Sequence, residues 1–186
     1  MTITQKIMIV DDEVEYIRKP LVRQLKRAFP KYDYLEAGNG KEALKLLETE
    51  QPVLVILDIM MPVMNGLDTL KVMKEQGCLE TTNVLVYTAS ADQTIHLEML
   101  AIGAMDVLNK TAPMEELNAR IGNHLLLAQR SEALKEAMNA LNAATKRELH
   151  KVNFALNHTP LSILITNSSG IIEYANKATF DFYGLT

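Results

Sequence analysis

The sequence predicts an α/β fold, in which a doubly wound parallel sheet of five strands carries helices on both faces. Two patterns in the 186 residues support this prediction. Five short apolar runs follow one another along the chain, and each is followed by an amphipathic segment of helical periodicity. Alternation of this kind is typical of parallel sheets, because parallel strands need a crossover connection. A long C-terminal helix and a small, incomplete α+β tail are expected to follow the sheet.

The five apolar runs predict the strands. In chain order these are Lys6–Val10, Tyr32–Glu36, Val53–Leu57, Val84–Tyr87 and Asp106–Asn109. The helices predicted between them are Val14–Phe29, Lys41–Glu50, Leu67–Gln76 and Thr94–Ile102, and a last helix begins at Met114. Pro20 lies inside the first helix, so we expect it to kink this helix or to shift its effective start.

The last helix is predicted to be long, because neither Gly nor Pro interrupts the chain between Gly122 and Pro160. Residues at alternating spacings of four and three form a heptad-like seam along it. They are Leu127, Ser131, Leu134, Met138, Leu141, Thr145, Glu148 and Val152. This seam favours a homodimer through a coiled-coil-like linker at residues 127–152. The alternative is a long surface helix that packs back on its own domain.

The tail reads as the beginning of a further domain. Leu161–Thr166 and Ile171–Ala175 predict a hairpin, and Asn176 can cap a short helix through Tyr183. A lone hairpin is marginal in water, so these residues are expected to belong to a domain that the chain does not complete. The predicted domains are 1–126, 127–152 and 153–186.

Composition narrows the function classes. The net charge of −4 argues against non-specific DNA binding but leaves room for a local basic face, and no direct nucleic-acid binding by this chain is expected. The lone Cys78 excludes an internal disulfide and fits a reducing compartment. No apolar stretch approaches the roughly 20 residues that span a bilayer. Residues 1–6 lack the apolar core of a signal peptide. A cytoplasmic protein without membrane attachment is therefore expected.

Polar residues follow the apolar runs at the positions where α/β sheets place their chemistry. Asp11 and Asp12 follow the first strand, Asp58 the third, Thr88 the fourth and Lys110 the fifth. The first and third strands are usually neighbours in such sheets, which brings the three carboxylates together. Carboxylates about 4 Å apart repel by about 4 kcal/mol at an effective dielectric near 20, so the cluster needs a cation.

Oxygen ligands with room for water suit Mg²⁺, which commonly shares its coordination with substrate phosphate. Lys110 adds a compact positive charge, and Thr88 adds a hydroxyl donor. Together these groups make a site for in-line phosphoryl transfer. A carboxylate is a sufficient nucleophile if the donor is a labile phosphoramidate and the product an acyl phosphate.

An ordered set of motifs resembles the receiver domain of two-component response regulators over residues 5–126. These motifs are Val10-Asp11-Asp12-Glu13, Gly38-x-Gly40-x-Glu42-Ala43-Leu44, Asp58-x-x-Met61-Pro62-x-Met64-x-Gly66, Thr88-Ala89 and Lys110. The resemblance implies a flavodoxin-like fold and a phosphoryl group accepted on Asp58 from a histidine kinase or phosphotransfer protein. It also implies a mainly regulatory phosphoacceptor, which assists its own phosphotransfer and slow autodephosphorylation; whether the chain counts as an enzyme stays open.

The resemblance also implies a role for each site residue. Asp12 and Asp58 would bind Mg²⁺ directly, together with the backbone carbonyl of Met60, whereas Asp11 would act largely through water. Lys110 would contact the phosphoryl group. Thr88, next to Ala89, would be the switch hydroxyl that moves towards it.

Two residues depart from the family pattern. Val107 stands where receivers usually carry Tyr or Phe, so the aromatic half of the usual switch is missing. Thr111 replaces the proline that usually follows the lysine in a cis peptide. A cis bond before a residue other than proline costs about 2.5–4 kcal/mol, so we expect a shifted or trans loop.

Residues 153–186 are similar to the opening of a PAS sensory domain, through the sequence Asn167-Ser168-Ser169-Gly170-Ile171-Ile172-Glu173-Tyr174-Ala175-Asn176-Lys177-Ala178. The resemblance implies that a change at the receiver passes to a dimeric helix and a PAS or output region. Two alternatives are a non-phosphorylated dimerisation scaffold and a Mg²⁺-dependent phosphohydrolase. Haloacid-dehalogenase-type enzymes have a second acid two residues after the nucleophile, where this chain has Met60. The four histidines share no metal-ligand spacing and are expected at the surface.

Overall fold

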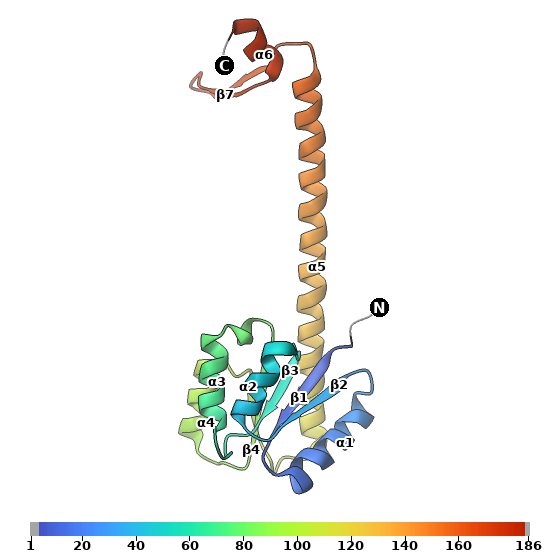
Figure 1. The fold of residues 1–186 in the computed structure, drawn as a ribbon, viewed down its shortest axis with the longest axis vertical. Helices are drawn as coiled ribbons and strands as arrows, with labels where there is room; N and C mark the ends of the chain where they lie inside the picture. Colours follow the sequence, from blue (N-terminus) through green and yellow to red (C-terminus); the bar gives the residue numbers. More distant parts are fainter. Residues whose placement is uncertain (1–3, 185–186) are drawn as a thin grey trace. The chain divides into compact units, whose positions relative to one another are not determined.

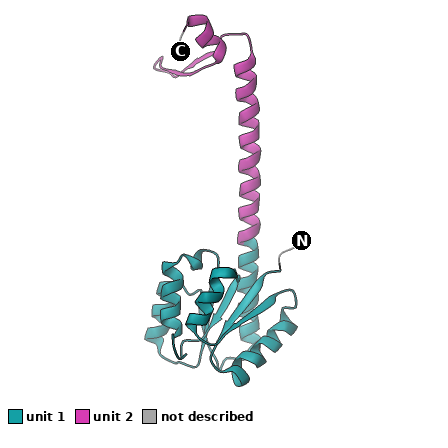
Figure 2. Cartoon of the chain, viewed as in Figure 1, with its two compact units in different colours: residues 1–130 teal, residues 131–186 magenta. Residues whose placement is uncertain are grey.

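The computed structural model describes residues 4–184; the outermost residues of the first and last predicted domains, 1–3 and 185–186, lie outside the described part. Two compact units divide the chain, Met1–Arg130 and Ser131–Thr186 (Figure 2). The first unit contains a parallel sheet with the strand order β2-β1-β3-β4-β5 (Figure 1). Its strands are β1 (Lys6–Val10), β2 (Asp33–Ala37), β3 (Leu54–Leu57), β4 (Asn83–Thr88) and β5 (Asp106–Asn109). The predicted fold class is confirmed, and β1 and β3 are neighbours as expected.

Helices cover both faces of the sheet. They are α1 (Lys19–Ala28), α2 (Gly40–Thr49), α3 (Gly66–Glu75), α4 (Gln93–Ile102) and α5 (Met114–His158), with short turns η1 (Val14–Arg18) and η2 (Cys78–Glu80). Alternate residues of β1 show the two layers. Ile7 and Ile9 lie in a buried cluster with residues of α1 and α5, whereas Met8 and Val10 lie in a cluster with residues of α2, α3 and α4. Because both faces are buried, the central strands are apolar without interruption.

Side-chain caps explain why three helices begin one residue before their predicted starts. Asn39, Asn65 and Asp92 precede α2, α3 and α4, and each accepts a hydrogen bond from a backbone amide of the first turn. The Asn65 oxygen, for example, accepts from the Asp68 amide at 2.8 Å. Such caps satisfy amides that have no partner within the helix.

The expected effect of Pro20 is confirmed. The segment predicted as one helix, Val14–Phe29, is a π-helical turn at Val14–Arg18 followed by α1, and Pro20 lies in the first turn of α1. The Arg18 amide donates to the Glu13 carbonyl at 2.9 Å, five residues back. Proline fits a first turn because its missing amide hydrogen would have no helical partner there.

Helix α5 is 45 residues long. Its first turns belong to the sheet unit, where Leu117, Ile121 and Leu125 are buried. Every residue from 129 to 155 is exposed, including the apolar members of the heptad-like seam within that stretch. These are Leu134, Met138, Leu141 and Val152. No helix within residues 4–184 combines the length and the apolar character that a membrane crossing requires.

The second unit ends in a small α+β segment. Strands β6 (Leu164–Thr166) and β7 (Ile172–Ala175) pair antiparallel, and α6 (Lys177–Tyr183) follows. The predicted hairpin is present, although β6 begins three residues after the predicted start at Leu161. The predicted cap is also present, because the Asn176 side chain accepts from the Thr179 amide at 3.1 Å.

Asn176 is fully buried and hydrogen-bonded at both ends of its side-chain amide. Its Nδ2 donates to the carbonyls of Leu156 and Leu161, each at 2.8 Å, and its Oδ1 also accepts from the Ile163 amide at 2.9 Å. The carbonyl of Leu161 is thus used by Asn176 and not by a strand partner. One side chain therefore joins the last turns of α5, the approach to β6 and the start of α6.

Candidate functional site

Three carboxylates meet at the carboxyl ends of β1 and β3. Oxygen atoms of Asp11, Asp12 and Asp58 all lie within 4.8 Å of one another. Asp11 and Asp58 are 3% and 5% exposed, and Asp12 is more exposed. The structure therefore brings together the three acids that the sequence places at two strand ends.

Lys110 joins this cluster from the end of β5. Its Nζ lies 2.7 Å from Asp11 Oδ2 and 2.7 Å from Asp58 Oδ2, and its side chain is 9% exposed. The Lys110 amide donates to the Thr88 carbonyl at 2.8 Å, which continues the pairing of β4 and β5 beyond Asn109. This backbone bond positions the lysine over the acids.

Burial and pairing compete in setting the protonation of these groups. Burial raises the pKa of the Asp11 carboxyl, and this outweighs the lowering effect of hydrogen bonds from Lys110 and the Glu13 amide. Burial would lower the pKa of Lys110, but hydrogen bonds and charge interactions with Asp11 and Asp58 raise it above its usual range. Lys110 is therefore a charged ammonium. For ionised Asp11, the hydrogen bonds from Lys110 and the Glu13 amide offset only part of the cost of burying its charge.

The carboxylates fit a hard divalent cation. Three acids face one ammonium within a few ångströms, so the ionised cluster keeps an excess of negative charge. Mg²⁺ prefers such oxygen ligands and retains several waters. Asp12, the more exposed acid, can reach a partly hydrated ion.

Backbone contacts hold the acids in place. Asp11 Oδ1 accepts from the Glu13 amide at 2.9 Å, and Asp58 Oδ1 accepts from the Met60 amide at 3.3 Å. Arg18 Nη1 donates to the Asp11 carbonyl at 2.7 Å. The role of Arg18 was not predicted from the sequence. Its only signal there is its basic side chain, one short helical segment after Asp11 and Asp12.

Thr88 is fully buried at the end of β4, and its Oγ1 accepts from the Ser90 amide at 3.2 Å. Ala89, between them, is exposed. Val107 is half-buried and packs against the cluster that contains Met99 of α4. The described residues contain no cis peptide bond, so the Lys110–Thr111 bond is trans, as expected.

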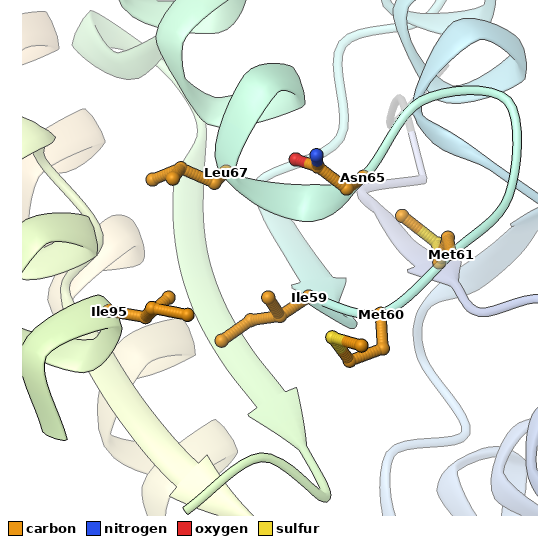
Figure 3. A pocket seen from close by; sticks show the side chains of 6 residues that line it. All are labelled: Ile59, Met60, Met61, Asn65, Leu67 and Ile95. Atoms are coloured by element: carbon orange, nitrogen blue, oxygen red, sulfur yellow. The ribbon is translucent and has the colours of Figure 1, made fainter. Parts of the chain in front are cut away.

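Met60 follows Asp58 by two residues. It is 67% exposed and lines an apolar pocket of about 250 Å³. Figure 3 shows this pocket beside the loop that follows Asp58, and its lining residues are Ile59, Met60, Met61, Asn65, Leu67 and Ile95. None of the three acids, Thr88 or Lys110 lines it, so the pocket is separate from the charged site.

Asp11→Asn is expected to stabilise the protein at neutral pH without divalent cations by roughly 1 kcal/mol, because burial disfavours the ionised Asp11 carboxyl and the charge of Asp58 adds to this. The folded-state pKa of Asp11 is raised, so its stabilising contribution is present below the unfolded value and is lost as pH rises through the folded value. The advantage of the neutral Asn should therefore grow as pH rises. Urea unfolding of both proteins in the presence of a chelator, from about pH 4 to about pH 8, measures this difference in stability.

Added Mg²⁺ should stabilise the wild type by mass action and should stabilise Asp11→Asn much less. Asp33→Asn, at the exposed start of β2, is the matched control and should leave both responses unchanged. Equal Mg²⁺ stabilisation of wild type and Asp11→Asn would contradict a role for Asp11 in holding the cation.

Comparisons with known proteins agree with this geometry. Residues 7–122 match the family model of the response regulator receiver domain. The chain is similar to the alkaline phosphatase synthesis transcriptional regulatory protein PhoP of Bacillus subtilis (strain 168), with 37% identity over 117 residues, covering 63% of this chain and 47% of PhoP. It is also similar to the regulatory protein AtoC of Escherichia coli (strain K12), with 31% identity over 182 residues, covering 91% of this chain and 38% of AtoC.

The chain thus spans about half or less of the length of these two relatives. Among solved structures, the chemotaxis protein CheY4 of Vibrio cholerae is similar with a TM-score of 0.59 and 28% identity, over 65% of this chain and 98% of CheY4. The family match, the parallel sheet and the acids at its strand ends agree. Through residues 7–122, the chain belongs to the response regulator receiver domain family of two-component systems.

Proposed function

We propose that Asp58 accepts a phosphoryl group from a histidine kinase or a phosphotransfer protein. The observation that carries this proposal is the contact of Lys110 Nζ with both Asp58 Oδ2 and Asp11 Oδ2, at the edge of the sheet where Asp12 also lies. An acceptor carboxylate, a fixed ammonium and further oxygen ligands are the parts that phosphoryl transfer requires.

In this reaction a carboxylate oxygen of Asp58 attacks the phosphorus of a phosphohistidine. The new O–P bond gives an acyl phosphate, the P–N bond breaks, and its electron pair returns to the imidazole nitrogen, which takes up a proton. Lys110 moves from Asp58 to a phosphoryl oxygen, and the Thr88 hydroxyl donates to another. Mg²⁺ held by Asp12, Asp58 and the Met60 carbonyl, with Asp11 acting through water, would neutralise charge on the phosphoryl oxygens.

We further infer that the signal leaves through a helical dimer. Exposed apolar residues recur along α5 between residues 129 and 155, and a second copy of the helix would cover them. The proposed division is a receiver at 1–126, a linker at 127–152 and a PAS opening at 153–186. Exposed apolar residues of the tail, such as Ile171 and Phe182, support a larger domain there.

Incubation with acetyl phosphate and Mg²⁺ tests the acceptor. Wild type should gain the mass of one phosphoryl group in an acid-labile bond, and Asp58→Asn should gain none. Asp33→Asn, an exposed acid on β2, should behave as wild type. Intact mass and oligomeric state are followed on the same samples.

Each outcome separates the alternatives. No gain in wild type would favour the dimerisation scaffold. Steady turnover of a phosphate monoester that Asp58→Asn abolishes would favour the phosphohydrolase. A mass gain without any change in association would show that α5 is not the output.

A further inference from the structure

The carbonyl of Ser90, two residues after Thr88, is held from two directions. It accepts a hydrogen bond from His96 Nε2 at 2.9 Å and from Asn109 Nδ2 at 3.4 Å. His96 belongs to α4, and Asn109 ends β5 directly before Lys110. A carbonyl can only accept, so the His96 Nε2 in this contact carries a hydrogen. These three residues are called the Ser90 clamp.

Ser90 is also tied to the candidate switch hydroxyl. Its amide donates to Thr88 Oγ1 at 3.2 Å, and its own Oγ accepts from the Asp92 amide at 3.3 Å. Asp92 in turn caps α4. The amide, the hydroxyl and the carbonyl of Ser90 are thus all engaged, so a displacement of the Thr88 hydroxyl must disturb this set of bonds.

Asn109 is fixed in the orientation that the clamp needs. Its Oδ1 accepts from the Thr111 amide at 2.9 Å and from Thr111 Oγ1 at 2.8 Å. An amide group whose oxygen faces two donors turns its nitrogen the other way, here towards Ser90. Asn109 is also the register partner of Thr88, so it lies beside the switch residue in the sheet.

We propose that His96 and Asn109 are positioning residues that hold the β4–α4 loop in its resting arrangement. Phosphorylation of Asp58 breaks their hydrogen bonds to the Ser90 carbonyl. This inference rests on the proposed function. Movement of Thr88 Oγ1 towards a phosphoryl oxygen removes the acceptor of the Ser90 amide, and Ser90 can follow only by giving up its bonds to His96 and Asn109. The release would reach the first turns of α4 without an aromatic side chain at Val107.

Release has a measurable sign, because coupling between two equilibria is reciprocal. If phosphorylation weakens the clamp, loss of the clamp must strengthen binding of a phosphoryl mimic. We expect His96→Leu and Asn109→Ala each to tighten binding of beryllium trifluoride, in the presence of saturating Mg²⁺, by about three- to tenfold, the effect of one net hydrogen bond. The affinity for Mg²⁺ alone should not change, because neither residue contacts the three acids.

Calorimetric titration of the full chain measures both affinities. His96→Gln keeps an N–H donor and should restore affinity towards the wild-type value. Leu97→Ala, exposed on the same helix, is the control and should match the wild type. The His96 variants decide the question if Asn109→Ala fails to fold.

Unchanged or weaker binding of beryllium trifluoride by His96→Leu would overturn the proposal. A shift in Mg²⁺ affinity as large as the shift in beryllium trifluoride affinity would also overturn it. Failure of the proposed function has a different signature. In that case wild type would not bind beryllium trifluoride, or Asp58→Asn would bind it equally well.

Discussion

Lys110→Met is expected to lower the free energy of unfolding by about 3 kcal/mol or more at neutral pH and to suppress phosphorylation of Asp58. The change leaves the carboxylates of Asp11 and Asp58 buried without their ammonium partner. The pKa of Lys110 is raised in the folded protein, so its stabilising contribution is fully present at neutral pH and is lost only as pH rises through the raised value. Lowering the pH should reduce the difference in stability between Lys110→Met and wild type, because protonation of Asp11 and Asp58 removes their unpaired negative charges.

Urea unfolding in a chelator measures this loss. Lys71→Met is the matched control, because Lys71 forms an exposed ion pair with Glu98 at 2.9 Å, and such pairs contribute about 1 kcal/mol or less. Mg²⁺ should restore part of the stability of Lys110→Met. A variant as stable as Lys71→Met would show that Lys110 is not needed to hold the acids.

Gly66→Ala is the second change for which a large effect is expected, about 2–4 kcal/mol of destabilisation together with slower phosphorylation. A Cβ at Gly66 would lie 2.2 Å from the Asp58 carbonyl oxygen and 2.9 Å from Ile59 Cα. Both are backbone atoms, which cannot rotate away as a side chain could. The start of α3 would have to move, and with it the bond from the Gly66 amide to the Ile59 carbonyl, at 2.9 Å.

Thermal unfolding and the acetyl phosphate assay test this effect together. Gly122→Ala provides the control, because its Cβ would meet Phe29 at an ordinary 3.8 Å and alanine favours the helix by roughly 0.5–1 kcal/mol. The control should be as stable as wild type or slightly more so. Wild-type stability in Gly66→Ala would mean that the Asp58 loop adapts without cost.

The strand ends could be predicted from the sequence because one physical rule places them. Continuous apolar runs identify buried strands, and parallel strands end at one edge, which is why Asp11, Asp58 and Lys110 could be expected to meet. Helix starts were less predictable. The caps Asn39, Asn65 and Asp92 lie one residue outside the apolar pattern that identifies a helix.

Contacts made by loops could not be predicted. The bond between Asn109 and Ser90 joins residues 19 apart, and its existence depends on the path of the β4–α4 loop. The expectation that the four histidines lie at the surface was wrong for His124, which is buried with its Nε2 3.7 Å from Asp106 Oδ2. His96 is half-buried. The hydrophobic periodicity of the sequence does not predict such side-chain contacts, because these side chains meet only after the sheet has formed.

Helix α5 has one continuous backbone but two different sources of stability. Its first turns share the core of the sheet, whereas every residue from 129 to 155 is exposed. Helices of that kind depend on local hydrogen bonds and open far more readily than packed ones. In the monomer, backbone amides along the exposed stretch should therefore exchange with solvent deuterium orders of magnitude faster than those of β1 or β3, and pairing of two copies should slow this exchange. No single melting temperature would then describe the whole chain.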